Sequence, residues 1–171
     1  RSVKKEDKVI DLCIVGKPNA GKSSLINAIL GQEKVITSPI PNTTRDATDT
    51  EFTYKDQKFN LIDTAGLKRR GRINRGIEKF SSLRVFSSIE RSDIAVLLID
   101  GEASVTNQDT HITEHVLAER KGLILAINKI DLLEKGEEMR DRIISKLRRK
   151  FSFVPWAPVV FVSAKNKTNT Y

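Results

Sequence analysis

Short apolar segments alternate with amphipathic segments along most of the chain. Several of the apolar segments are apolar almost throughout, which is typical of parallel strands that are covered on both faces. Two others flank the turn Lys55-Asp56-Gln57 and have the pattern of a hairpin. In all, we predict six strands, at residues 9–15, 51–54, 58–62, 94–100, 122–128 and 159–163.

Helical patterns lie between these strands. Residues 22–30 form a helical stretch that ends at Gly31, and residues 108–120 form another, with Thr106 and Asp109 placed as in a capping box. Strands that alternate with helices predict an α/β fold, in which a doubly wound, mainly parallel six-stranded sheet carries helices on both faces. A further helix is indicated by apolar residues at every fourth position, Met139, Ile143, Leu147 and Phe151.

Residues 1–171 are expected to form a single domain, because the sequence has no internal repeat, low-complexity tract or linker. The chain ends six residues after Lys165, where a fold of this class normally adds a final helix. We therefore expect the domain to be one fragment of a larger protein and to lack its C-terminal helix.

Composition and charge narrow the class of protein. Hydrophobic residues make up 39% of the chain and charged residues 30%, as in soluble globular domains. No segment approaches the roughly 20 apolar residues of a membrane span. The lone cysteine, Cys13, lies in a predicted strand and agrees with a reducing cytoplasm. The net charge of +8 indicates either a polyanionic partner such as RNA or a solvated basic face, and some of the basic residues are concentrated at residues 68–75 and 146–150.

The strongest local motif follows the first predicted strand. Residues 16–23, Gly-Lys-Pro-Asn-Ala-Gly-Lys-Ser, match G-x-x-x-x-G-K-[ST] and lead into a predicted helix. In such a P-loop, backbone N–H groups and the helix N-terminus bind phosphate oxygens. Lys22 would neutralise the β- and γ-phosphates, and Ser23 would offer its hydroxyl to Mg²⁺. The residues predicted to bind nucleotide here are Gly16, Asn19, Ala20, Gly21, Lys22, Ser23 and Ser24.

A second motif would select the base. Asn128-Lys129-Ile130-Asp131 ends a predicted strand, at the edge where an open α/β sheet binds ligands. The Asp131 carboxylate would accept hydrogen bonds from N1–H and the exocyclic amine of guanine, a donor pair that adenine lacks. Asn128 would bind near the purine N7 and tie its loop to the P-loop, while Lys129 would lie over the base. In Ser163-Ala164-Lys165, at the end of the next strand, the Ala164 N–H would contact the guanine O6.

Two more segments would complete a site for magnesium and the γ-phosphate. Asp63-Thr64-Ala65-Gly66 ends a strand; Asp63 would hold Mg²⁺ through a water, and the Gly66 N–H would contact the γ-phosphate. In residues 41–46, Thr44 (or, as the alternative, Thr43) would close over Mg²⁺ and release after hydrolysis. The predicted catalytic residues are thus Lys22, Thr44, Asp63 and Gly66, and the predicted Mg²⁺ ligands are Ser23, Thr44 and Asp63.

These motifs resemble the translation-factor-related GTPases, and within that class the Der (EngA) family. The similarity covers residues 8–165 and is most specific at DTAGLKRRG, EKFS and IERSD (residues 63–71, 78–81 and 89–93), which resemble the second of two tandem G domains. The resemblance implies a P-loop NTPase G domain from a factor for large ribosomal subunit assembly, with another G domain before it and a KH-like domain after it.

The expected partners follow from the same resemblance. They are GTP or GDP, ribosomal RNA or a ribosomal subunit, and other domains of the same protein, with no membrane partner. Era-like GTPases, which act on small-subunit assembly, and TrmE-like GTPases, which act in tRNA modification, share the shorter motifs and are the nearest alternatives.

Two positions bear on the rate of hydrolysis. Leu67 follows Gly66, where Ras-like GTPases carry a glutamine that orients the attacking water, so intrinsic hydrolysis should be slow. Asn19 matches an asparagine that helps to bind a monovalent cation in potassium-activated relatives, which implies stimulation by K⁺. Pro41-Asn42 departs from the usual Ala-Gly in the loop that would complete this cation site.

Three functions are open at this point. The chain is an enzyme whose GTP hydrolysis drives a conformational switch, a nucleotide-gated RNA- or protein-binding module with negligible hydrolysis, or an ATPase. A separate pattern, His111-Ile112-Thr113-Glu114-His115, fits the zinc-peptidase signature H-x-x-E-H. A third ligand is not evident in the sequence, and we interpret both histidines as surface residues.

Overall fold

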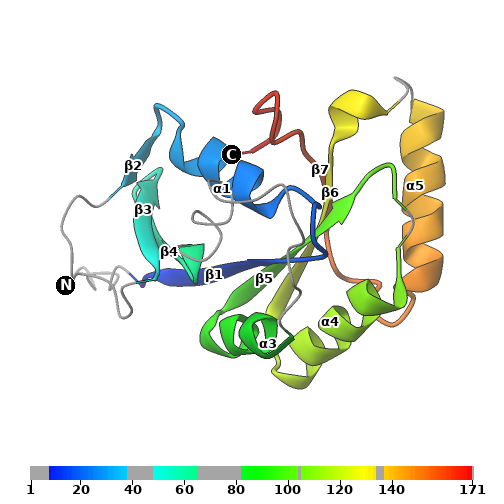
Figure 1. Cartoon of the computed structure of the whole chain (residues 1–171), viewed down its shortest axis with the longest axis horizontal. Coiled ribbons are helices and arrows are strands. Elements are labelled where there is room, and N and C mark those ends of the chain that lie inside the picture. The colour runs from blue at the N-terminus through cyan, green and yellow to red at the C-terminus, as the bar shows by residue number, and fades with distance from the viewer. Residues whose placement is uncertain (1–7, 38–47, 65–81, 104, 134–136, 171) are drawn as a thin grey trace, which may run out of the picture.

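A mixed β-sheet organises the part of the chain that the structure describes. The structure is a computed structural model and describes residues 8–37, 48–64, 82–103, 105–133 and 137–170. Within these residues, seven strands lie in the order β2-β3-β4-β1-β5-β6-β7 (Figure 1). Their bounds are Ile10–Val15 (β1), Val35–Thr37 (β2), Thr50–Tyr54 (β3), Gln57–Leu61 (β4), Ile94–Asp100 (β5), Gly122–Asn128 (β6) and Val159–Phe161 (β7).

The sheet is parallel except at one edge. Strands β4, β1, β5, β6 and β7 run parallel, whereas β2 and β4 each pair with β3 in antiparallel fashion. The hairpin between β3 and β4 turns through Lys55 and Asp56, whose positive φ angles of 46° and 62° suit a two-residue turn. The mainly parallel sheet is confirmed, but the prediction of six strands is wrong by one. β2 has three residues, two of them exposed, and is too short to show a period.

Helices cover both faces of this sheet, as predicted. α1 (Lys22–Leu30) lies on one face, and α3 (Ser82–Arg91), α4 (Asn107–Ala118) and α5 (Glu137–Lys150) lie on the other (Figure 1). A short 3₁₀ helix, η1 (Ile130–Leu132), follows β6. Among the described residues, no helix has both the length and the apolar character that crossing a membrane requires.

Local sequence accounts for the helix boundaries. Gly31 is the C-cap of α1, as expected, and the backbone N–H of Thr106 donates to Asp109 Oδ2 at 2.8 Å, so the capping box of α4 is confirmed. α3 was not predicted, although Phe86 and Ile89 of this helix recur at helical spacing and pack in or against the core.

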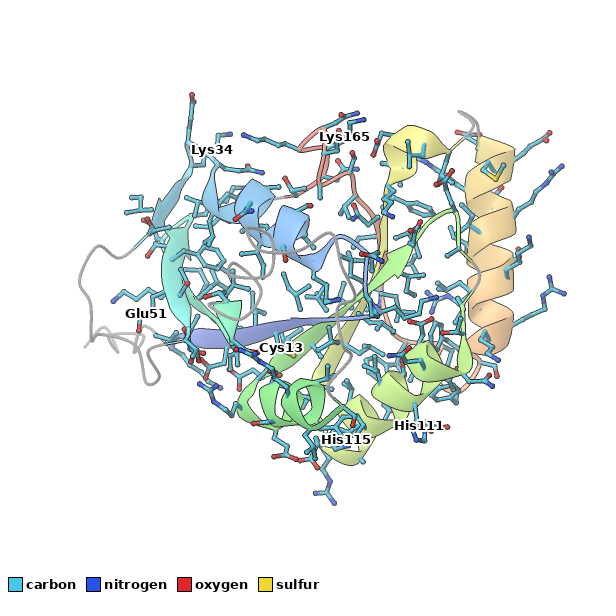
Figure 2. All side chains as sticks on the ribbon, viewed as in Figure 1. Cys13, Lys34, Glu51, His111, His115 and Lys165 are labelled. Carbon is cyan, nitrogen blue, oxygen red and sulfur yellow. The ribbon has the colours of Figure 1, made fainter. Side chains whose placement is uncertain are left out.

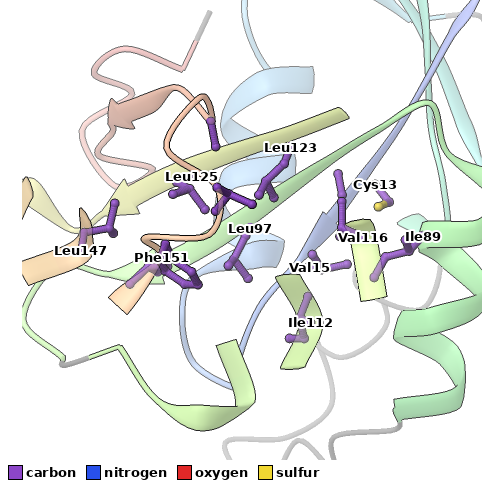
Figure 3. Close-up of a cluster of buried hydrophobic side chains, with 14 of the residues drawn as sticks. Cys13, Val15, Ile89, Leu97, Ile112, Val116, Leu123, Leu125, Leu147 and Phe151 are labelled. Carbon is purple, nitrogen blue, oxygen red and sulfur yellow. The ribbon is translucent and has the colours of Figure 1, made fainter. Parts of the chain in front are cut away.

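Two apolar cores join the layers. On the side of α3, α4 and α5, buried residues such as Ile89 and Phe151 pack against β1, β5 and β6 (Figure 3). On the other side, Leu25 and Ile26 of α1 pack against the sheet. Burying each such side chain contributes about 1.5–3 kcal/mol, so the strand ends are firmly positioned. Cys13 belongs to the first core, where burial raises its pKa to about 11, as befits a structural residue.

Candidate functional site

Five chain segments reach the same edge of the sheet. Neighbouring parallel strands have their carboxyl ends at one edge, and β4, β1, β5, β6 and β7 are such neighbours. The P-loop sequence follows β1, Asp63 follows β4, Asp100 ends β5, Asn128 ends β6, and Ser163 follows β7. The topology therefore brings together motifs that lie far apart in the sequence.

The P-loop backbone takes a shape that requires glycine at two positions. Gly16 has a φ of 146° and Gly21 a φ of 98°. A Cβ at Gly16 would lie 2.4 Å from the carbonyl oxygen of Leu98, and one at Gly21 would lie 2.3 Å from Asn128 Nδ2. Lys22 Nζ donates to the carbonyl oxygens of Gly16 (3.1 Å) and Lys17 (2.6 Å), which places a positive charge within the loop.

Asn128 joins three loops into one unit. Its Nδ2 donates to the Ala20 carbonyl oxygen at 2.9 Å, and its Oδ1 accepts from the Ala164 backbone N–H at 3.1 Å. The expected tie between Asn128 and the P-loop is thus present. Asn128 is only 2% exposed, so water does not compete for these bonds. In this structure the Ala164 N–H, which we expected to contact guanine, binds Asn128.

Asp131 is oriented by a buried serine. Ser163 Oγ donates to Asp131 Oδ1 at 2.6 Å and accepts from the backbone N–H of Asn166 at 3.1 Å. Both the donor and an acceptor position of this hydroxyl are therefore used within the protein. Ser163 positions the carboxylate on which base selection would depend.

Lys129 is paired with a carboxylate that sequence reasoning missed. Its Nζ donates to Asp100 Oδ2 at 2.5 Å, from a backbone with a left-handed φ of 64°. Partial burial favours a higher pKa for Asp100, but hydrogen bonds from Lys129 and from the backbone N–H groups of Glu102 and Ala103 outweigh it and lower the pKa. An acidic residue at the end of a predicted parallel strand is the sequence signal that identifies Asp100.

Asp63 is held by α3, which sequence reasoning also missed. Arg84 donates from Nε and Nη2 to the two carboxylate oxygens of Asp63, and this hydrogen bonding raises the pKa of Arg84. The backbone N–H of Asp63 donates to Asp49 Oδ1 at 2.9 Å, and Arg91 pairs with the buried Asp49 carboxylate. Arginines near the two ends of α3 thus fix the carboxylate and the backbone of Asp63.

Of the other predicted site residues, some lie in the described part of the chain and some lie outside it. Ser23 and Ser24 lie in the first turn of α1, Asn19 has a left-handed φ of 62°, and Lys165 is exposed (Figure 2). Several predicted residues lie outside the described part of the chain, namely Thr43, Thr44, Gly66, Leu67 and the basic residues 68–75.

Curated relatives align with more than nine tenths of the chain. The chain is 53% identical over 160 residues to the GTPase Der of Thermomicrobium roseum, with 92% of this chain and 35% of the relative aligned. It is 52% identical over 159 residues to the GTPase Der of Chloroflexus aurantiacus, with 93% of this chain and 35% of the relative aligned. The resemblance to the Der family is confirmed, and the chain spans about a third of the length of these relatives.

Solved structures support the same fold. A structure of Era in complex with MgGDPNP and a fragment of 16S ribosomal RNA matches with a TM-score of 0.67 and 25% identity, over 95% of this chain and 53% of that chain. An Era variant from Aquifex aeolicus bound to GDP and aluminium fluoride matches with a TM-score of 0.64 and 26% identity, over 95% of this chain and 53% of that chain. The family model described as 50S ribosome-binding GTPase matches residues 11–129. The chain belongs to this family of GTPases.

Proposed function

We propose that the described edge of the sheet binds GTP and that its hydrolysis switches the domain between two states. The observation that carries this proposal is the side chain of Asn128, which links the P-loop at Ala20 to the loop at Ala164. A ligand in contact with both loops would carry phosphates at one end and a base at the other. Asp131, held by Ser163, supplies the carboxylate that accepts the two guanine donors.

Mg²⁺ fits the donor chemistry of this site. The Ser23 hydroxyl and the Asp63 carboxylate are hard oxygen ligands, which Mg²⁺ prefers, and we assign Thr44 as the third. Bound Mg²⁺ would supply positive charge beside the transferring phosphoryl group. Lys22 would neutralise phosphate oxygens, and the Gly66 N–H would sense the γ-phosphate. We also assign Asn19 to a K⁺ ion that adds charge where other GTPases use an arginine.

At the level of the whole protein, we propose a role in the assembly of the large ribosomal subunit. The support is the name of the matched family and the similarity to proteins named GTPase Der. The Era structure contains both a guanine nucleotide analogue and a fragment of 16S ribosomal RNA, which favours ribosomal RNA as a partner here as well. The chain spans about a third of its relatives, so further domains, among them a preceding G domain, would act with it in the cytoplasm.

Phosphate release from GTP and ATP, in KCl and in NaCl at equal ionic strength, tests this proposal. We expect repeated turnover of GTP, no turnover of ATP, and a higher rate in KCl. Asp131→Ala should weaken GTP binding by at least about tenfold, because hydrogen bonds to a charged group contribute about 1.5–3 kcal/mol. Equal turnover of ATP would refute the guanine assignment, and equal rates in both salts would refute the K⁺ site.

Binding without turnover is the specific alternative. Leu67 cannot orient water as a glutamine does, so the isolated chain could bind GTP and hydrolyse it negligibly. Single-turnover measurements separate this binding module from an enzyme.

For the RNA partner, Lys68/Arg69/Arg70→Ala should weaken binding of a ribosomal RNA fragment and preserve GTP affinity. Arg142→Ala on α5, an exposed position in a surface ion pair, is a control that removes one positive charge, against three in the triple variant. Unchanged RNA binding in the triple variant would refute the assignment.

A further inference from the structure

A cluster of one histidine and two glutamates lies between α3 and α4. Glu90 comes from the last turn of α3, His115 from the last turn of α4, and Glu119 is the C-cap of α4. One ligand atom from each of the three side chains lies within 4.8 Å of the others. His115 and Glu119 are four residues apart and share one helical face, so two neighbouring helices contribute to the cluster.

His115 Nε2 is a buried polar atom that lacks a hydrogen bond within the described part of the chain. Its nearest charged neighbour there is Glu90 Oε1, at 3.9 Å. A buried imidazole nitrogen normally has a partner, because leaving it unsatisfied costs about 1–3 kcal/mol. Phe86 stacks on the imidazole ring with the centroids 4.1 Å apart, which fixes the plane of the ring. The unpaired nitrogen therefore has a defined direction and an open position for a partner.

The two histidines of the H-x-x-E-H pattern behave differently. The His111 side chain is 79% exposed and bonds to Glu114 within its own helix, whereas the His115 side chain is 23% exposed and belongs to the cluster. His111 is therefore a surface residue, as interpreted from the sequence, whereas His115 is only partly exposed. Figure 2 shows both on the opposite side of the molecule from Lys165, so this cluster is separate from the candidate nucleotide site.

We propose that Glu90, His115 and Glu119 bind a zinc ion. Zinc takes imidazole nitrogen and carboxylate oxygen together, and three protein ligands with one water are a common tetrahedral set. Two carboxylates would also balance the charge of the ion. Ligand atoms around tetrahedral zinc lie about 3.4 Å apart. The Glu90 side chain, 56% exposed, has the freedom to close the present separation by rotation.

Such a site would clamp α3 to α4. Lys121 Nζ already donates to the Glu90 carbonyl oxygen at 2.8 Å and anchors the end of α3, and the ion would add a second bond between the two helices. The same α3 helix carries Arg84, which holds Asp63 at the nucleotide edge. Zinc would thus restrain the helix that positions Asp63, from a site between α3 and α4 that is separate from the candidate nucleotide site.

Zinc titration of the chelator-treated chain, with Mg²⁺ in excess, tests the proposal. We expect one equivalent of zinc to bind by calorimetry, and cobalt in its place to show the visible absorption of a tetrahedral site. Zinc should also raise the melting temperature. Loss of a residue that only hydrogen-bonds to a metal ligand lowers metal affinity about 10–100-fold. His115 is itself a proposed ligand, so His115→Ala should weaken zinc binding by at least about tenfold. His111→Ala, four residues earlier on the same helix, should bind zinc as the unchanged chain does.

Two further variants test whether zinc binding is lost because a ligand is lost or because the chain fails to fold. His115 packs on Phe86, so circular dichroism must show that His115→Ala is folded. Glu90→Gln and Glu119→Gln keep the size of each side chain and remove a ligand charge, and each should weaken zinc binding at least about tenfold. Absence of zinc binding in the unchanged chain would overturn the proposal. Equal affinity in the unchanged chain and both glutamine variants would also overturn it, as would a loss in His111→Ala that matches His115→Ala.

Discussion

Asp100 and Lys129 form an ion pair whose strength depends on pH. The pKa of Asp100 is lowered from 3.8 in the folded chain, so its charged form stabilises the folded state at pH values above 3.8. This stabilisation is lost as the pH falls through the lowered pKa. We expect Asp100→Asn to reduce the free energy of unfolding by about 1 kcal/mol near neutral pH, and the difference to vanish in strong acid.

Urea denaturation at several pH values between neutrality and strong acid measures this difference. Asp141→Asn on α5, an exposed position, should show no comparable effect at neutral pH. A difference for Asp100→Asn that grows as the pH falls would mean that the pair does not act as described.

Arg84 is hydrogen-bonded to the Asp63 carboxylate, which we assign as a ligand of Mg²⁺. Both oxygens of Asp63 accept from its guanidinium, so the ion and the arginine compete for one ligand. Arg84→Gln should therefore lower the Mg²⁺ concentration for half-maximal GTP hydrolysis by several-fold. Phosphate release over a magnesium series checks this, with Arg142→Ala as a control of equal charge change. A higher magnesium requirement would instead show that Arg84 orients Asp63 for the ion.

At the scale of the element, α4 depends on the carboxylate of its capping box. Asp109 is fully buried; its Oδ2 accepts from the Thr106 N–H and lies 3.5 Å from Lys17 Nζ. The side chain thus joins the start of α4 to the P-loop. We expect Asp109→Ala to cost about 2–3 kcal/mol, because a helix cap and a buried charge pair are lost together. Urea denaturation measures this, and Glu114→Gln, exposed on the same helix, should change it by less than about 0.5 kcal/mol.

The elements differ in how much of each the sequence determines locally. β5 and β6 were predicted to the residue, because their apolar runs are long and both faces are buried. The capping box of α4 was predicted because all its groups lie within four residues. β2, by contrast, exists through its pairing with β3, and three residues carry no period of their own. Elements that depend on a distant partner are those that local patterns miss.

At the scale of the whole molecule, the candidate site also contains residues that short local motifs predict and residues that depend on distant partners. The P-loop and Asn128-Lys129-Ile130-Asp131 were predicted because each is a short continuous motif at the end of a strand. Arg84, Asp49 and Asp100 were missed because each acts on a residue at least 14 positions away in the sequence, which the fold brings close. Glu90 could not be grouped with His115 and Glu119 from the sequence for the same reason, since it comes from a different helix.

Nucleotide binding should stabilise the whole molecule, because the candidate ligand contacts loops from both halves of the sheet. GDP at about 100 times its Kd adds about 2.7 kcal/mol to the free energy of unfolding. In a domain of this size, that raises the melting temperature by about 5–10 °C. We expect this shift with GDP and not with ADP, and thermal denaturation followed by circular dichroism measures it.

Asp131→Asn tests whether this stabilisation depends on base recognition. An amide oxygen still accepts from guanine N1–H, but its NH₂ group faces the exocyclic amine, donor against donor, so most of the shift with GDP should be lost. Xanthine carries a carbonyl oxygen in place of that amine, and the amide that Asp131→Asn introduces can donate to it. Xanthosine diphosphate should therefore restore the shift in the variant and give little in the unchanged chain. A variant that GDP stabilises as before would show that the base lies elsewhere, whereas exchange of preference between the two nucleotides would locate it at the carboxylate that Ser163 holds.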